Sequence, residues 1–107
     1  MANNYKNAKV DLTTTDATVL YTCPAATTAV MRSILVSDDS GSGDTITVTI
    51  TDASAAIFNV FNLKAISANT TSELLSEPLV VQENEVIKVT AATADRLHVV
   101  ASLLEMS

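Results

Sequence analysis

The chain is poor in aromatic residues: its 107 residues include no Trp, two Phe and two Tyr. A β-domain that binds sugars generally does so on exposed aromatic side chains, so this composition disfavours a glycan-binding module. Hydrophobic residues still make up 48% of the chain. A chain of this length buries roughly two thirds of its unfolded surface. We therefore expect one domain with an aliphatic core.

Residues for catalysis and metal binding are equally scarce. Cys23 is the only cysteine, which excludes an intrachain disulfide, and we expect it to be a small buried hydrophobe. His98 is the only histidine, so a His-rich metal site is excluded. No Gly-x-Ser-x-Gly motif is present, and both glycines fall in one Ser/Asp loop rather than in a phosphate-binding motif. The sequence predicts a non-enzymatic protein with no catalytic residue, cofactor or metal.

Basic residues are outnumbered two to one, with six Lys and Arg against twelve Asp and Glu and a net charge of −6. Six scattered cations do not form a stripe that tracks phosphates, so we expect no direct nucleic-acid partner. Apolar runs are only a few residues long, so we expect no membrane span. Residues 1–6 are polar and lack the apolar segment of a signal peptide, so we expect synthesis in a cytoplasm.

One acidic loop is the only plausible cation site. It contains Asp38, Asp39 and Asp44, with Ser40 and Ser42 between them. Its spacing does not match the EF-hand pattern, although calcium could use several of its oxygens. A solvated turn is the favoured interpretation.

The sequence is rich in β-branched residues that alternate with polar ones. Fifteen Thr are present, and in residues 44–52 Thr alternates with Ile and Val without a break. This period of two is typical of a strand with one apolar face. Eight such runs follow one another at intervals of about ten residues: 18–23, 29–37, 44–52, 56–63, 71–75, 79–81, 86–91 and 97–104.

These runs predict an all-β fold, an antiparallel two-sheet β-sandwich of jelly-roll type with about eight strands. An immunoglobulin-like sandwich is the alternative. We expect residues 1–9 to form a flexible N-terminal arm and residues 10–107 to form the single β-sandwich domain. The glycines of residues 38–44 predict a β-hairpin between the second and third runs.

Two of the predicted strands are apolar on both faces. In 97–104, Leu97, Val99, Ala101 and Leu103 make one face, but the other face also carries apolar residues. In 29–37, Val30, Ile34 and Val36 are expected to face one way and the remaining apolar residues the other. Only one face of each strand meets the core of a two-layer sandwich, so the second face predicts a subunit interface. The candidate interface residues are Met31, Leu35, Val100, Leu104 and Met106.

The polar arm offers a second candidate surface. It either frays or orders against a neighbouring molecule. The candidate contact residues in it are Asn3, Asn4, Tyr5, Lys6 and Asn7.

The order of motifs resembles a known family of viral proteins. Tyr-Thr-Cys-Pro-Ala at 21–25 precedes Thr-Thr-Ala-Val-Met-Arg-Ser-Ile-Leu-Val-Ser at 27–37, and a Thr-Ile-Thr-Val strand follows. Ser-Glu-Leu-Leu-Ser-Glu-Pro-Leu-Val at 72–80 and Val-Ile-Lys-Val at 86–89 complete the pattern. The chain thereby resembles small structural proteins of tailed bacteriophages, including capsid decoration (cement) proteins of the cyanophage type.

The resemblance implies a jelly-roll protein that forms homotrimers on the outer surface of the capsid. Such trimers bridge copies of the major capsid protein and stabilise its lattice. The arm would contact the shell. The expected partners are therefore the chain itself and the major capsid protein, and the expected location is the outer surface of the virion after synthesis in the host cytoplasm. A tail, neck or fibre module, a small glycan-binding module and a small enzyme are the alternatives.

Overall fold

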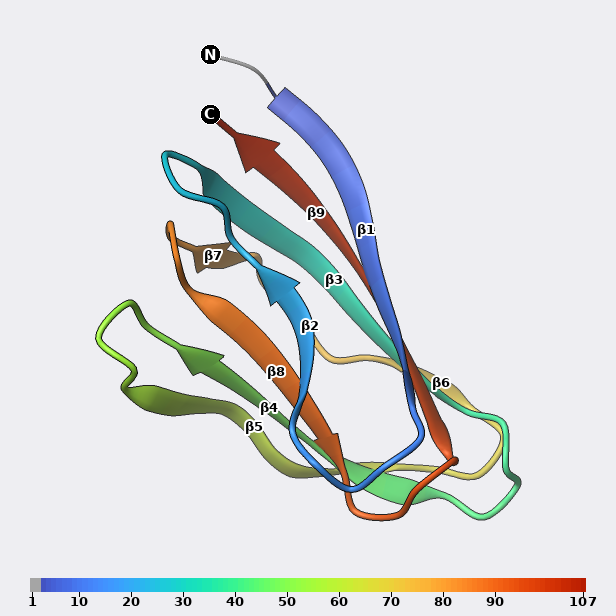
Figure 1. The fold of residues 1–107 in the computed structure, drawn as a ribbon. Coiled ribbons are helices and arrows are strands. Elements are labelled where there is room, and N and C mark those ends of the chain that lie inside the picture. The colour runs from blue at the N-terminus through green and yellow to red at the C-terminus, as the bar shows by residue number, and fades with distance from the viewer. Residues whose placement is uncertain (1–2) are drawn as a thin grey trace.

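Nine antiparallel strands divide between two sheets in the computed structural model, which describes residues 3–107 (Figure 1). Within those residues no helix is long and apolar enough to span a membrane. The strands are β1 (Asn3–Leu12), β2 (Thr18–Thr22), β3 (Thr28–Asp38), β4 (Asp44–Thr51), β5 (Ile57–Ile66), β6 (Thr71–Glu73), β7 (Leu79–Val81), β8 (Val86–Ala91) and β9 (Leu97–Met106).

The strand order is that of a jelly roll. Sheet A has the order β1-β9-β3-β6. β7 also pairs with β3, near the start of that strand, whereas β6 pairs with β3 near its end. Sheet B has the order β2-β8-β4-β5. Apart from the β4–β5 hairpin, strands that follow one another in the chain are not paired with each other. The all-β sandwich predicted from the sequence is confirmed, and this strand order fits a jelly roll rather than an immunoglobulin-like sandwich.

The core lies between the two sheets. It consists of the side chains that alternating strand positions turn inward, every second residue along each central strand. β9 buries every second residue from Leu97 to Leu103, and Ile46 and Val48 of β4 are fully buried against them from sheet B. Pro24 follows β2 and Pro78 precedes β7, where a missing backbone N–H ends regular pairing. The threonines of β4 are only half-buried, as their alternation predicts.

The N-terminal segment is a strand rather than a flexible arm. Met1 and Ala2 lie outside the described residues, and residues 3–9 form the first part of β1, which pairs with β9 along its whole length from Asn3–Met106 to Leu12–Leu97. The alternation of the sequence does not mark this strand, because its first residues are polar. β1 pairs with only one neighbouring strand, and most of its side chains are exposed, so few apolar positions mark it.

A β-bulge in β3 determines which residues of that strand face the core. The pairing with β9 shifts by one residue between Met31 and Ser33, which leaves Arg32 as the extra residue. Met31 is therefore on the same side as Ile34, and it is 0% exposed. The prediction of Met31 as an interface residue is wrong for this reason, and Val30, predicted to face the core, lies on the outer side.

The loop between β3 and β4 crosses from one sheet to the other. β3 belongs to sheet A and β4 to sheet B, so the predicted hairpin between them does not form. Gly43 has φ +72, and a Cβ placed there would lie 3.1 Å from the carbonyl oxygen of Ile66. Glycine is needed here for the sheet crossing, not for a two-residue hairpin.

Truncating a core side chain tests this packing. Ile34→Ala truncates a fully buried side chain. It should lower the free energy of unfolding by about 3 kcal/mol, because the shorter side chain leaves a cavity in the core. Val19→Ala, at a position that is half exposed on sheet B, should change it by about 1 kcal/mol or less. Urea denaturation followed by circular dichroism measures both. Equal losses for the two variants would contradict the assigned faces.

Candidate interaction surface

The outer face of sheet A carries a continuous row of apolar side chains. Directly paired residues of an antiparallel sheet share a face. Tyr5 is paired with Leu104, Leu104 with Val30, and Val30 with Val80, so the row crosses β1, β9, β3 and β7. Tyr5 is 78% exposed and Val80 51% exposed. No element of the described chain covers this row.

A second group of apolar residues lies further along the same face. Val100 of β9 pairs with Leu35 of β3, and the two are 39% and 38% exposed. Met106, at the other end of β9, alternates with buried Glu105 and lies on the outer side. We call the apolar residues of this face the outer patch: Tyr5, Val30, Leu35, Val80, Val100, Leu104 and Met106. Four of the five interface residues predicted from the sequence, all but Met31, lie in it.

Both signs of charge lie on the outer face: Glu73 pairs with Leu35 and Asp11 pairs with His98, while two cations, Arg32 and Lys9, stand beside the outer patch. Arg32 projects from the bulge beside a shallow hollow of about 360 Å³, which Tyr5, Asn7 and Ser102 also line. Lys9 is paired with Val100. Within residues 3–107, no carboxylate lies within ion-pair distance of either cation. A partner of this face would therefore combine apolar groups with a carboxylate.

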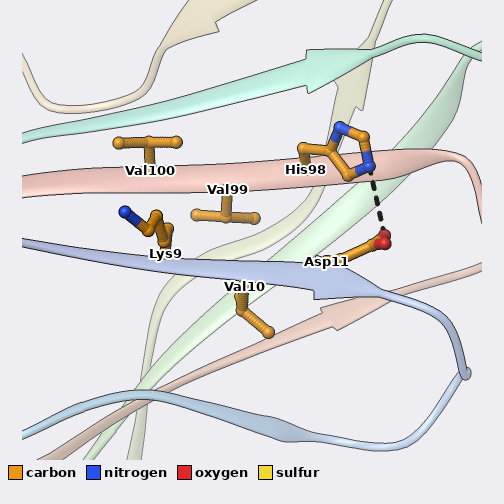
Figure 2. A pocket seen from close by; sticks show the side chains of 6 residues that line it. All are labelled: Lys9, Val10, Asp11, His98, Val99 and Val100. Atoms are coloured by element: carbon orange, nitrogen blue, oxygen red, sulfur yellow. Dashed lines mark ion pairs between the residues drawn. The ribbon is translucent and has the colours of Figure 1, made fainter.

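His98 is held between two carboxylates at the end of this face. Its Nε2 lies 3.2 Å from Asp11 Oδ1, and its Nδ1 lies 3.6 Å from Asp39 Oδ2. Figure 2 shows Asp11 reaching from β1 toward His98 of β9, beside an open hollow of about 300 Å³ that Lys9 and Val100 also line. The carboxylates contact different ring nitrogens, so they do not converge with the imidazole on one point. This geometry does not form a metal site among the described residues.

The acidic loop binds its own backbone rather than offering its oxygens to a cation. Asp38 accepts hydrogen bonds from Ser40 N at 2.9 Å, Ser40 Oγ at 2.6 Å and Gly43 N at 2.6 Å. The hydrogen bond from the Ser40 side chain lowers the pKa of Asp38. Asp44 Oδ2 accepts from Thr93 N at 2.9 Å. No cluster of three or more potential metal ligands occurs in the described part of the chain.

A buried carboxylate ties three strands together near the chain ends. Glu105 of β9 accepts a hydrogen bond from Tyr21 Oη of β2, and its Oε1 lies 3.0 Å from Lys6 Nζ of β1. These contacts join sheet A to sheet B. The hydrogen bond from Tyr21 and then that from Lys6 lower the pKa of Glu105. Burial, and then the hydrogen bond to Glu105, raises the pKa of Tyr21.

The five predicted arm residues are separated by this arrangement. Lys6 engages Glu105 within the chain, while Tyr5 lies in the outer patch. Asn3, Asn4 and Asn7 remain exposed on β1. Glu105 was not among the predicted site residues, although the alternation of buried residues from Leu97 to Leu103 places it on the inner side of β9.

The pH dependence of stability tests the Glu105 contacts. Because the pKa of Glu105 is lowered in the folded chain, its contribution is present above the ordinary value of 4.5 and is lost as pH falls through the lower folded pKa. Glu105→Gln should therefore unfold more easily than wild type at pH 7, by about 1 kcal/mol, and the difference should shrink below pH 4.5. Exposed Glu77→Gln is the control. A difference that stays constant with pH would contradict the assignment.

Comparison with known proteins supports the fold and does not assign a family. No family model matches the chain, and no curated protein matches it in sequence. One similar solved structure comes from Bacillus endospore appendages, described as a novel family of disulfide-linked pili; it is 9% identical, with a TM-score of 0.60 over 99% of this chain and 87% of that one. Another is a pentameric capsid protein from metagenomic phage sequences, 19% identical, with a TM-score of 0.50 over 94% of this chain. The chain spans 59% of that capsid protein's length. At these identities the likenesses establish a shared β fold.

Proposed function

We propose that this chain is a non-enzymatic structural protein of a tailed-phage virion. It forms homotrimers on the outer surface of the capsid and stabilises the lattice of the major capsid protein. The observation that carries the proposal is the outer patch, an apolar face that the described chain leaves uncovered. Large exposed apolar patches mark sites of protein association.

Several charged groups make contacts within the chain. Asp38 and Asp44 accept hydrogen bonds from loop N–H groups, Glu105 links strands, and His98 is flanked by carboxylates. An assembly role needs no catalytic group, and a rigid sandwich with an uncovered apolar face fits it. Many weak contacts repeated over a shell would give strong binding through avidity.

The motif resemblance supports the capsid location, and the phage capsid protein with a similar fold is consistent with it. A tail, neck or fibre module is the second candidate, because a pilus protein of similar fold is also a component of a filamentous assembly. The same outer patch would serve either assembly. Glycan binding is less well supported, because exposed Tyr5 and Phe58 lie on different sheets and do not form one platform.

The mass of the purified chain tests self-association. Sedimentation equilibrium should give a mass three times that of the 11.2 kDa chain, and Leu104→Lys should reduce it to that of a monomer by placing a charge in the outer patch. Val19→Lys, on sheet B, should leave the trimer intact. A wild-type monomer at every concentration would contradict the proposal.

Copy number in the virion separates the two candidates. Decoration of the shell predicts that quantitative mass spectrometry of purified virions finds this chain at a level close to that of the major capsid protein. A copy number per virion that is enough for only one ring of subunits would contradict the capsid location and favour a tail or neck module.

A further inference from the structure

A second uncovered apolar surface lies on sheet B, at the turn between β4 and β5. Residues 53–59 are all exposed, and five of them are apolar: Ala53, Ala55, Ala56, Ile57 and Phe58. Figure 1 shows this hairpin end projecting away from sheet A at the left of the molecule. We call residues 52–58 the hairpin tip.

Phe58 lies on the inner face of its sheet, but sheet A does not cover it there. It pairs with Ile50, which in turn pairs with fully buried Ile87 on the inner side of sheet B. Phe58 is nevertheless 56% exposed, because the hairpin extends beyond the part of the sandwich that sheet A covers. An aromatic side chain in this position is typical of the anchor residues of protein interfaces.

The hairpin tip is also fixed in shape and carries one negative charge. Asp52 Oδ1 accepts hydrogen bonds from Ser54 N at 2.9 Å and Ala56 N at 3.0 Å, so the turn is held before any partner arrives. Its other oxygen, Oδ2, has no hydrogen-bond donor among residues 3–107. No cation occurs in residues 52–58.

The hairpin tip and the outer patch are complementary in charge. Arg32 and Lys9 lie on the patch without a carboxylate partner, and Asp52 lies on the tip with a free oxygen. The tip carries no cation, so contact between two tips would bring two negative charges together. Contact between a tip and a patch instead brings Asp52 to cations that have no carboxylate partner within residues 3–107, and it covers both apolar surfaces.

We propose that the hairpin tip of one copy docks on the outer patch of a second copy, with Phe58 against the row of Tyr5 and Leu104 and with Asp52 facing Arg32. The two surfaces lie on different sheets, so one chain uses both at once. Such head-to-tail contacts close into rings when the rotation permits. The inference rests on the proposed self-assembly and names the surface that the outer patch binds.

Sedimentation equilibrium of single variants tests the apolar contact. Phe58→Ser should raise the dissociation constant of the assembly about 30-fold, as expected when an interface anchor is lost. Val19→Ser, which removes another half-exposed apolar side chain outside both surfaces, should change it less than about twofold. An assembly that Phe58→Ser leaves unchanged would overturn the docking mode while leaving self-assembly standing, whereas a monomeric wild type would overturn both.

A charge exchange tests the ionic contact. Arg32→Asp and Asp52→Arg should each weaken assembly about tenfold. The double variant should recover most of the loss, because an ion pair forms again with its two charges exchanged. Losses that simply add would overturn the assigned pair. Circular dichroism of each variant checks folding, since Asp52 also holds the turn.

Cross-linking tests the docking mode without relying on the Asp52 variant. Mixed Phe58→Cys and Leu104→Cys chains should form a disulfide between one chain of each kind on mild oxidation. Native Cys23 is fully buried and serves as the unreactive control. Dimers formed by the Phe58→Cys chain alone would reveal a tip-to-tip contact and would overturn the proposal.

Discussion

The extra residue in β3 is the constraint on which the outer surface depends. Before Arg32, Ala29 and Met31 face the core; after it, Ile34 and Val36 do. A regular strand would send one of these two sets outward, which would cost several kcal/mol through exposed apolar residues and cavities. The bulge lets both sets pack in a single core. It also projects Arg32 outward and leaves Val30 and Leu35 on the outer face beside β9. The core and the outer patch therefore have a common origin.

The remaining contacts make the outer face rigid. β9 pairs with β1 on one side and β3 on the other, so it fixes the positions of the patch residues on all three strands. Glu105 links β9 to Tyr21 on the opposite sheet and to Lys6 on β1. A rigid surface loses little conformational entropy when a partner covers it, so more of the burial energy appears as affinity. The capping of the turn by Asp52 gives the same benefit to the hairpin tip.

Period-two alternation was sufficient to predict the sandwich and the positions of β2 to β9. It also identified Leu35, Val100, Leu104 and Met106 as outward residues, because these lie in strands that are apolar on both sides. Three features escaped it for physical reasons. The bulge at Arg32 depends on pairing with β9, more than sixty residues away, and it reversed the assignment of Met31 and Val30. β1 is an edge strand whose first residues are polar, and its alternation is confined to Ala8, Val10 and Leu12. The loop with both glycines resembles a hairpin locally, although it crosses between sheets.

The central claim is that another copy of the chain covers the outer patch. Hydroxyl-radical footprinting of the assembled protein, read by mass spectrometry, measures this directly at individual side chains without any substitution. The account predicts that Tyr5 and Leu104 are strongly protected relative to the dissociated chain, while half-exposed Val19 on sheet B reacts equally in both states. Equal oxidation of Tyr5 in the assembled and dissociated states would contradict it.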